Sequence, residues 1–273
     1  MEYVTVRGER VPRLGLGTGE LRGDACFAAV SAALALGYRH LDTAAFYRNE
    51  DELGRALRVS AVAREEVFLT TKVWWSDAAG HRVRASAEAS LRRLGTEYVD
   101  LLLLHWPAPH VPVAETMAAL CAVQQAGGAR HVGVSNFPPS LVREAARHAP
   151  VFCNQVEYHP LLAQEELLDR ADEFDHLLTA YSPLAQGAVA REPLVRRLAE
   201  HYGRSPAQIA LRWLVQQPRV AAIPRSASSS HLAGNLAIFD FELSHDDMKA
   251  LGELARRRAL RLSNPGFAPD WTR

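Results

Sequence analysis

Short apolar runs alternate with longer helix-like segments along this chain of 273 residues, and this alternation limits the fold more strongly than any other feature. The candidate strands are 14–17, 40–42, 67–72, 99–105, 131–134, 151–156, 177–181 and 220–223. The candidate helices that follow them are 24–36, 49–58, 81–94, 114–126, 139–148, 164–173, 206–217 and 229–236. Near-continuous apolar strands, such as the leucines at 101–104, are typical of parallel strands buried on both faces. The repeat predicts an α/β fold, a closed eight-stranded parallel (β/α) TIM barrel.

Segments outside this repeat add to the barrel without adding a domain. Residues 3–12 (YVTVRGERVP) predict an N-terminal β-hairpin, and further helices are expected at 191–202 and 245–258. The tail from Leu260 is predicted to be irregular because its prolines and glycine oppose helix. No linker or change of composition divides the chain, so we expect a single domain over residues 1–273.

Two helix starts carry capping signals. Asp24 is predicted to cap the helix at 24–36, and Gly37 follows its end. Ser205 and Gln208 form a capping-box pattern with a proline at the first helical position between them. These signals support the helical boundaries in the repeat.

The charge balance and the cysteines narrow the classes of partner. Lys+Arg and Asp+Glu number 31 each, so we expect no broad attraction to nucleic acid or to an anionic membrane. The cysteines at 26, 121 and 153 have neither disulfide nor metal spacing, which is typical of a reducing compartment. Charges interrupt the first residues where a signal peptide needs an apolar core, and no apolar run has the length of a membrane span. We expect a cytoplasmic protein.

Polar and ionisable residues follow almost every candidate strand, and in TIM barrels the reaction site lies at these carboxyl ends. They are Gly17-Thr18, Asp42, Lys72, His105-Trp106, Ser135-Asn136, Asn154-Gln155-Val156-Glu157, Tyr181-Ser182 and Pro224-Arg225-Ser226. Singly, each has a plain structural explanation; Asp42, for example, is an ordinary turn residue. Gathered at one rim they predict a site, because buried charges need partners, and Asp42 and Lys72 on adjacent strands can form such a pair.

The stretch GYRHLDTAAFYRNE (37–50) adds a phenol, Tyr47, five residues after Asp42. A phenol with the ordinary pKa of about 10 is a weak acid at neutral pH. An adjacent Lys72 ammonium favours the phenolate, so we expect it to lower the pKa of Tyr47 and make the phenol a usable proton donor. Asp42 would hold Lys72, and His105 would orient a substrate oxygen. This set suits protonation of an oxygen that becomes negative as hydride attacks a carbonyl.

These stretches resemble the aldo-keto reductase family over nearly the whole chain. The matching segments are GLGT (15–18), GYRHLDTAAFYRNE (37–50), TKVW (71–74), LLLLHWP (101–107), GVSNF (133–137), NQVEYHP (154–160), AYSPLAQG (180–187) and IPRS (223–226). Among its subgroups, the short bacterial reductases of 2,5-diketo-D-gluconate and methylglyoxal look nearest, and their tail is similar to SNPGFAPDW at 263–271.

The resemblance implies an NAD(P)H-dependent carbonyl reductase without a metal. Its four catalytic positions fall on Asp42, Tyr47, Lys72 and His105. The implied cofactor-binding residues are Gly17, Thr18, Asp42, Ser135, Asn136, Gln155, Tyr181, Ser182, Leu184, Gln186, Pro224, Arg225, Ser226, His231 and Asn235. Within this set, the residues at 135, 136 and 155 would bind the nicotinamide amide and Tyr181 would stack on its ring, while the loop 182–187 would pass the pyrophosphate.

Departures from the family pattern bear on specificity. Gly19 stands where the family usually has an aromatic residue, which should open the pocket on that side. Arg225 replaces a common lysine that grips the 2′-phosphate of NADP, and it keeps the charge. His231 and Gly234 replace a family arginine and glutamate, which weakens discrimination against NADH. We therefore expect NADPH to be preferred, with NADH possible.

The predicted substrate pocket has aromatic walls with one polar end, which suits small or planar carbonyl compounds. Its residues are Phe46, Tyr47, Trp74, His105, Trp106 and Phe267, with Trp271 as a further candidate. Sugar-derived ketones, methylglyoxal, β-keto esters and aromatic aldehydes all fit this description. A monomer, the usual form of the family, is expected.

Three other interpretations compete with this one. The glycines at 15, 17 and 19 with Asp42 imitate a dinucleotide-binding fingerprint, but the third fingerprint position is Glu20 and no helix opens there. A barrel hydrolase or lyase using Asp42 and Lys72 leaves Ser135, Asn136 and Gln155 unexplained. A nucleotide-binding regulatory subunit on the same fold, with little turnover, is the remaining alternative.

Overall fold

The computed structural model describes residues 1–271 and has the predicted order of strands and helices. Strands β1 (Tyr3–Val6) and β2 (Glu9–Pro12) pair antiparallel as the N-terminal hairpin. The parallel strands are β3 (Leu16–Gly17), β4 (His40–Asp42), β5 (Phe68–Val73), β6 (Val99–Leu104), β7 (Ala129–Ser135), β8 (Cys153–Glu157), β9 (Leu177–Tyr181) and β10 (Val220–Ala222). The α-helices are α1 (Gly23–Leu36), α2 (Glu50–Val59), α3 (Gly80–Leu94), α4 (Val113–Gln125), α5 (Pro139–Ala146), α6 (Glu165–Phe174), α7 (Pro193–Tyr202), α8 (Pro206–Val215), α9 (Ser229–Leu236) and α10 (His245–Arg258). Each bound lies within two residues of its prediction.

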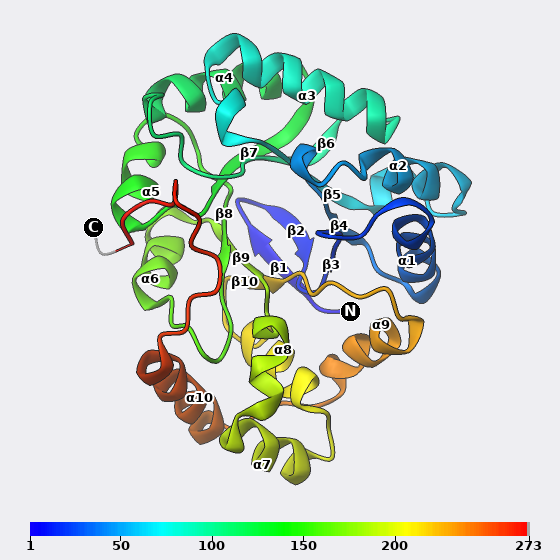
Figure 1. Ribbon diagram of the computed structural model, residues 1–273, viewed down its shortest axis with the longest axis vertical. Helices are drawn as coiled ribbons and strands as arrows, with labels where there is room; N and C mark the ends of the chain where they lie inside the picture. Colours follow the sequence, from blue (N-terminus) through cyan, green and yellow to red (C-terminus); the bar gives the residue numbers. More distant parts are fainter. Residues whose placement is uncertain (272–273) are drawn as a thin grey trace.

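The parallel strands form one eight-stranded sheet in the order β10-β9-β8-β7-β6-β5-β4-β3. Its strands are buried along almost their whole length, as their apolar sequences predict. Figure 1 shows the helices arranged as an outer ring around these strands, with the hairpin inside the ring. No helix within residues 1–271 combines the length and the apolar character needed to cross a membrane.

The predicted closure of the barrel is found only in part. Strands β3 and β10 are the two edges of the sheet, and no regular ladder joins them within residues 1–271. One isolated parallel bridge links Leu14 to Ala222, and Gly17 N donates to Pro224 O at 3.1 Å. Gly17 permits this approach, because a Cβ at this position would lie 2.7 Å from Ile223 O. The edges therefore meet through a few contacts rather than through a continuous strand pair.

Two apolar clusters form the core. The larger one fills the space between the sheet and the helices. The smaller one lies inside the barrel, where Val4, Val6 and Val11 of the hairpin pack with residues that lie mostly near the amino ends of the strands, namely Phe68, Leu101, Leu103, Phe152, Cys153, Leu177 and Ala221. The hairpin thus covers the amino end of the barrel, and the carboxyl end is left for a site.

One of the two predicted caps is correct. Ser205 Oγ accepts from Gln208 N at 3.2 Å and Gln208 Oε1 accepts from Ser205 N at 2.9 Å, so the capping box is confirmed. Gly37 ends α1 with a φ of 99°, as predicted. Asp24 does not cap α1: the helix begins one residue earlier, and the Asp24 carboxylate instead accepts from Arg55 Nη2 at 3.0 Å.

Candidate active site

A cavity of about 660 Å³ opens at the carboxyl ends of the parallel strands. Most of the residues predicted for the site line it, namely Gly17, Asp42, Phe46, Tyr47, His105, Trp106, Asn136, Gln155, Tyr181, Ser182, Leu184, Gln186, Pro224 and Arg225. Others predicted for the site lie behind or beside this wall, namely Thr18, Lys72, Trp74, Ser135, Ser226, His231, Asn235 and Phe267. The volume suits a dinucleotide-sized or drug-sized ligand.

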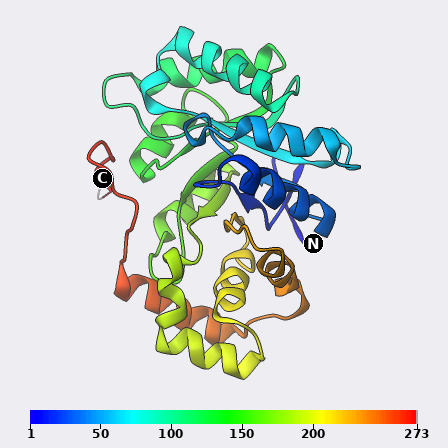
Figure 2. The ribbon, with the colours of Figure 1, turned by 45° about the vertical axis from the view of Figure 1, so that its right-hand side comes forward.

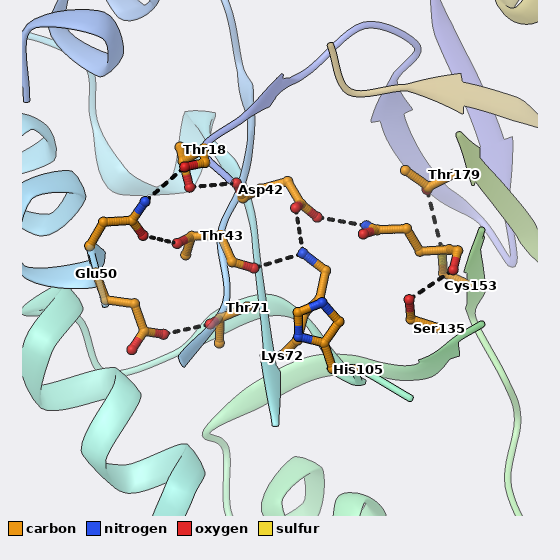
Figure 3. A network of polar contacts seen from close by, with 12 residues as sticks. Thr18, Asp42, Thr43, Glu50, Thr71, Lys72, His105, Ser135, Cys153 and Thr179 are labelled. Carbon is orange, nitrogen blue, oxygen red and sulfur yellow. Dashed lines mark hydrogen bonds and ion pairs between the residues drawn. The ribbon is translucent and has the colours of Figure 1, made fainter. Parts of the chain in front are cut away.

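The predicted pair between Asp42 and Lys72 is present beneath the cavity. Lys72 Nζ donates to Asp42 Oδ1 at 2.5 Å and to Thr43 O at 2.8 Å, and the lysine is fully buried (Figure 3). Burial disfavours the ammonium, but the Asp42 carboxylate and Tyr47 outweigh this effect and raise the pKa of Lys72 above its ordinary value. Lys72 therefore carries a fixed positive charge at neutral pH.

The turn that carries Tyr47 is held by buried hydrogen bonds. Tyr47 ends the 3₁₀ helix η1 (Ala45–Tyr47), and Arg48 next to it has a positive φ of 53°. Asn49, which is fully buried, donates to Thr18 O at 2.8 Å and accepts from Thr43 Oγ1 at 2.7 Å. Figure 3 shows Thr18 and Thr43 beside the Asp42–Lys72 pair. The strand end, the turn and the loop after β3 are thus fixed relative to one another.

The expected lowering of the pKa of Tyr47 is wrong as a net effect. Lys72 Nζ lies 5.1 Å from the centroid of the half-buried Tyr47 ring. Desolvation raises the pKa of this phenol, the Lys72 ammonium lowers it, and Asp42 raises it again, so the result lies above the ordinary tyrosine value. Lys72 lowers the pKa of Tyr47 as predicted, but desolvation raises this pKa by more. Tyr47 is therefore fully protonated at neutral pH.

His105 lies next to Tyr47 and is kept neutral. Its ring centroid is 5.5 Å from that of Tyr47, edge-on, and the residue lines the cavity although only 7% of it is exposed. Burial, with a smaller effect of Lys72, holds the pKa of His105 well below the ordinary histidine value. A neutral imidazole beside a protonated phenol can hydrogen-bond to a substrate oxygen without competing for its proton.

The four residues expected around a nicotinamide are linked to one another. Asn136 accepts from Tyr181 Oη at 2.8 Å and donates to Ser135 Oγ at 3.0 Å. Gln155 donates to Asp42 Oδ2 at 2.6 Å, and its main-chain oxygen accepts from Ser135 Oγ at 2.8 Å. Asn136, Gln155 and Tyr181 face the cavity, whereas Ser135 supports them from the buried side.

The charged and polar residues expected near the phosphate end of the cofactor are Arg225, Ser226, His231 and Asn235. Of these four, only Arg225 lines the cavity. Ser226 is buried and accepts from Ser228 N at 3.1 Å, and Asn235 is also buried. His231 is exposed at the start of α9. These three therefore shape the loop beside Arg225 rather than the cavity wall.

The predicted aromatic wall forms a stacked cluster. The rings of Phe46 and Trp74 stack with centroids 3.9 Å apart, and Phe267 meets Trp74 at 5.7 Å and Trp106 at 5.6 Å, edge-on. Trp271 lies 6.3 Å from Trp106. Only Phe46 and Trp106 of these line the cavity directly, so Trp74 and Phe267 form a second layer that supports them.

Glu20, Arg22, Ile223 and Ser263 also line the cavity, and none of them was assigned a role from the sequence. Glu20 and Arg22 lie on the loop after β3, and Glu20 has a positive φ of 66°. Ser263 reaches the cavity from the irregular tail. Ile223 and Ser263 begin two of the segments that resemble the family, IPRS and SNPGFAPDW, whereas Glu20 and Arg22 belong to no recognisable pattern.

Comparison with known proteins agrees with this geometry. Residues 13–256 match the model of the aldo/keto reductase family. The chain belongs to this family. An aldo-keto reductase from Mycolicibacterium smegmatis is 41% identical over 258 residues, which cover 93% of each chain. The methylglyoxal reductase DkgB of Yersinia pestis is 37% identical over 266 residues, covering 96% of this chain and 99% of that protein.

Solved structures of aldo-keto reductases superpose closely on this chain. A protein provisionally named 2,5-diketo-D-gluconic acid reductase B has a TM-score of 0.96 at 44% identity, with 99% of this chain and 97% of that chain covered. The aldose reductase of Schistosoma japonicum has a TM-score of 0.90 at 30% identity, with 96% and 94% covered. The aldo-keto reductase resemblance predicted from the motifs is therefore confirmed, and the family is one of oxidoreductases that act on carbonyl groups.

Proposed function

We propose that this aldo-keto reductase reduces small aldehydes and ketones to alcohols, with NADPH as the preferred reductant, NADH as a weaker one, and Tyr47 as the proton donor. The observation that carries the proposal is the buried Asp42–Lys72 pair beneath a protonated Tyr47 and a neutral His105, both of which line one cavity. We expect the protein to act as a monomer in the cytoplasm.

The cofactor would lie along the groove that runs from Asn136 to Arg225. Asn136 and Gln155 offer amide groups that match the nicotinamide carboxamide, and Tyr181 offers a ring face beside them. The loop that contains Ser182 passes between these residues and Arg225, whose guanidinium suits the 2′-phosphate. The bound NADPH supplies the hydride.

The protein's own part in the reaction is to hold the carbonyl oxygen and to give it a proton. His105, which is neutral, donates a hydrogen bond that orients the oxygen toward Tyr47. As negative charge develops on that oxygen, it becomes more basic than a phenolate, so the Tyr47 proton moves to it. The Lys72 ammonium stabilises the phenolate that forms, and Asp42 keeps Lys72 charged and in place. A raised pKa of Tyr47 in the resting protein serves this order of events, because the donor starts fully protonated.

A kinetic panel tests the proposal. Oxidation of NADPH and of NADH is followed with methylglyoxal, a sugar-derived ketone, a β-keto ester and an aromatic aldehyde as substrates. We expect turnover with NADPH at a higher kcat/KM than with NADH, and loss of at least about a hundredfold in kcat for Tyr47→Phe. Full activity of Tyr47→Phe would exclude Tyr47 as the donor, and an unchanged protein fluorescence on adding either nucleotide would exclude the cofactor assignment.

A further inference from the structure

A buried carboxylate, Glu157, lies at the carboxyl end of β8 and contacts the C-terminal tail. Its Oε1 accepts from Leu262 N at 2.8 Å and its Oε2 accepts from Ser263 N at 2.7 Å. His159 Nε2 lies 3.0 Å from the same Oε1. The side chains of Glu157 and His159 are fully buried. Within residues 1–271, the carboxylate is therefore hydrogen-bonded by the tail backbone and by one neighbouring histidine.

The hydrogen bonds between Glu157 and the tail amides contribute more to stability than hydrogen bonds between neutral groups do. A carboxylate is costly to bury unless its oxygens are hydrogen-bonded, so the two tail amides and Glu157 depend on each other. Hydrogen bonds to a charged acceptor are roughly twice as strong as neutral ones. The amides and His159 outweigh the burial of Glu157 and hold the pKa of its carboxyl below the ordinary value, so it stays ionised.

The tail has few other backbone attachments to the barrel. It follows α10 as an irregular segment without a helix or strand within residues 259–271 (Figures 1 and 2). Leu260 N donates to Leu161 O at 2.7 Å, and Ala268 N donates to Pro265 O within the tail itself. Glu157 thus holds the tail at residues 262–263, and from there the tail crosses to the cavity.

The residues that the tail contributes to the site come directly after this attachment. Ser263 lines the cavity. Phe267 packs against Trp74 and Trp106, and Trp271 packs against Trp106. If the tail were displaced at 262–263, this aromatic layer would lose its position while the Asp42–Lys72 pair would not.

We propose that Glu157 is a positioning residue that holds the C-terminal tail over the substrate end of the cavity and so sets the affinity for the carbonyl substrate. The substrate part of this inference rests on the proposed function. Glu157 and Gln155 are two residues apart on β8 and project to the same face. Strand β8 therefore carries both a residue of the proposed nicotinamide site, Gln155, and the residue that anchors the tail, Glu157. Of the two, only Glu157 sets the position of the aromatic substrate wall.

The test compares Glu157→Gln with a matched control, Asp100→Asn. Asp100 is also buried at 4% exposure and also accepts a backbone amide, from Leu69 N at 2.9 Å, but it lies near the amino end of β6 and pairs with Arg64 and Arg130. In Glu157→Gln, the new side-chain amide group would face one of the two tail amides, so a donor would meet a donor. Glu157→Asp, which keeps the charge but shortens the reach, is the second variant if the first is poorly folded.

The readouts are hydrogen exchange of the tail amides, the steady-state constants and the NADPH affinity. We expect exchange at 262–263 in Glu157→Gln to be faster by at least about tenfold, and KM for the carbonyl to rise by about tenfold. The kcat at saturation and the Kd for NADPH should stay within about twofold of the wild type, because the hydrogen bonds that hold Lys72, Gln155 and Asn136 go to partners outside the tail. Asp100→Asn should leave both tail exchange and KM unchanged.

Unchanged tail exchange in both Glu157 variants would overturn the anchor. Faster tail exchange with an unchanged KM, or a Kd for NADPH that changes as much as KM, would overturn the link to substrate affinity. Absence of turnover by the wild type with every carbonyl would instead contradict the proposed function, and the exchange measurement would still decide whether Glu157 holds the tail.

Discussion

Arg225 Nη2 donates to Glu20 Oε2 at 2.8 Å, so the cation that we propose for the 2′-phosphate already has an anionic partner in the same chain. Both residues line the cavity, and they join the loop after β3 to the loop after β10. Their side chains are 52% and 80% exposed, for Arg225 and Glu20 in that order, which makes this a weak pair. A phosphate that binds Arg225 must either displace the Glu20 carboxylate or share the guanidinium with it.

We therefore predict that Glu20→Gln strengthens NADPH binding by about two- to fivefold, the range expected from an exposed ion pair. NADH lacks the 2′-phosphate, so its affinity should change less. The measurement is a fluorescence titration with each nucleotide. Glu165→Gln, which removes a carboxylate from another exposed pair with Arg256, is the control for net charge. An equal gain for NADPH and NADH would show that Glu20 does not compete with the phosphate.

Gly19 leaves space above Tyr47, and filling it should select against large substrates. A Cβ at Gly19 would lie 3.7 Å from Tyr47 Cζ and 3.9 Å from Tyr47 Oη, which are ordinary contacts. Gly19→Trp would therefore place an indole over the proton donor without a backbone clash. We expect KM for an aromatic aldehyde to rise by about tenfold and KM for methylglyoxal to change little. Gly19→Ala, which adds only the Cβ, should behave like the wild type; equal effects of Trp on both substrates would contradict a size filter.

The contacts that the sequence predicted well are those between residues on strands that are neighbours in the sheet. Asp42 and Lys72 end adjacent parallel strands, so strand register alone brings them within reach. The direction of the Tyr47 pKa was predicted wrongly, because it depends on how much desolvation opposes the lysine, and spacing contains no measure of burial. The sequence thus predicted the contact between Asp42 and Lys72 but not the net direction in which the pKa of Tyr47 is shifted.

The contacts that the sequence could not predict join segments far apart in the chain. Glu20 and Arg225 are separated by 205 residues, and Glu20 has a left-handed backbone conformation where the two residues meet. Glu157 was visible as one polar residue at a strand end, but nothing in the irregular tail indicated that its amides turn back to that carboxylate. Loop and tail conformations of this kind leave no periodic pattern in the sequence.

The buried Asp42–Lys72 pair makes a stability prediction that is separate from activity. Lys72→Met leaves the Asp42 carboxylate buried without its cation, which should lower the free energy of unfolding by about 3–5 kcal/mol. The double variant Asp42→Asn/Lys72→Met removes both charges and should recover most of that loss, while both variants lack activity. Denaturant unfolding of the two proteins makes the comparison. A double variant no more stable than Lys72→Met would mean that the unpaired charge is not the cause.

His176 is predicted to make the fold sensitive to acid. It is fully buried just before β9, and neither ring nitrogen has a hydrogen-bond partner within residues 1–271. Burial, with smaller effects of Arg7 and Arg219, lowers the pKa of His176 to about 4. Between pH 6.5 and 4 the unfolded chain binds a proton here that the folded chain does not, so stability falls as the pH falls through this window.

The size of this effect follows from the shift: roughly 3 kcal/mol of unfolding free energy should be lost between pH 7 and pH 4 through His176 alone. His176→Phe should remove that share and flatten the pH dependence of denaturant unfolding over the same window. Other buried histidines, such as His40, also have lowered pKa values, so the remaining slope should stay above zero. The exposed His110→Phe is the control and should leave the slope unchanged. A slope in His176→Phe as steep as that of the wild type would assign the acid sensitivity to the other histidines.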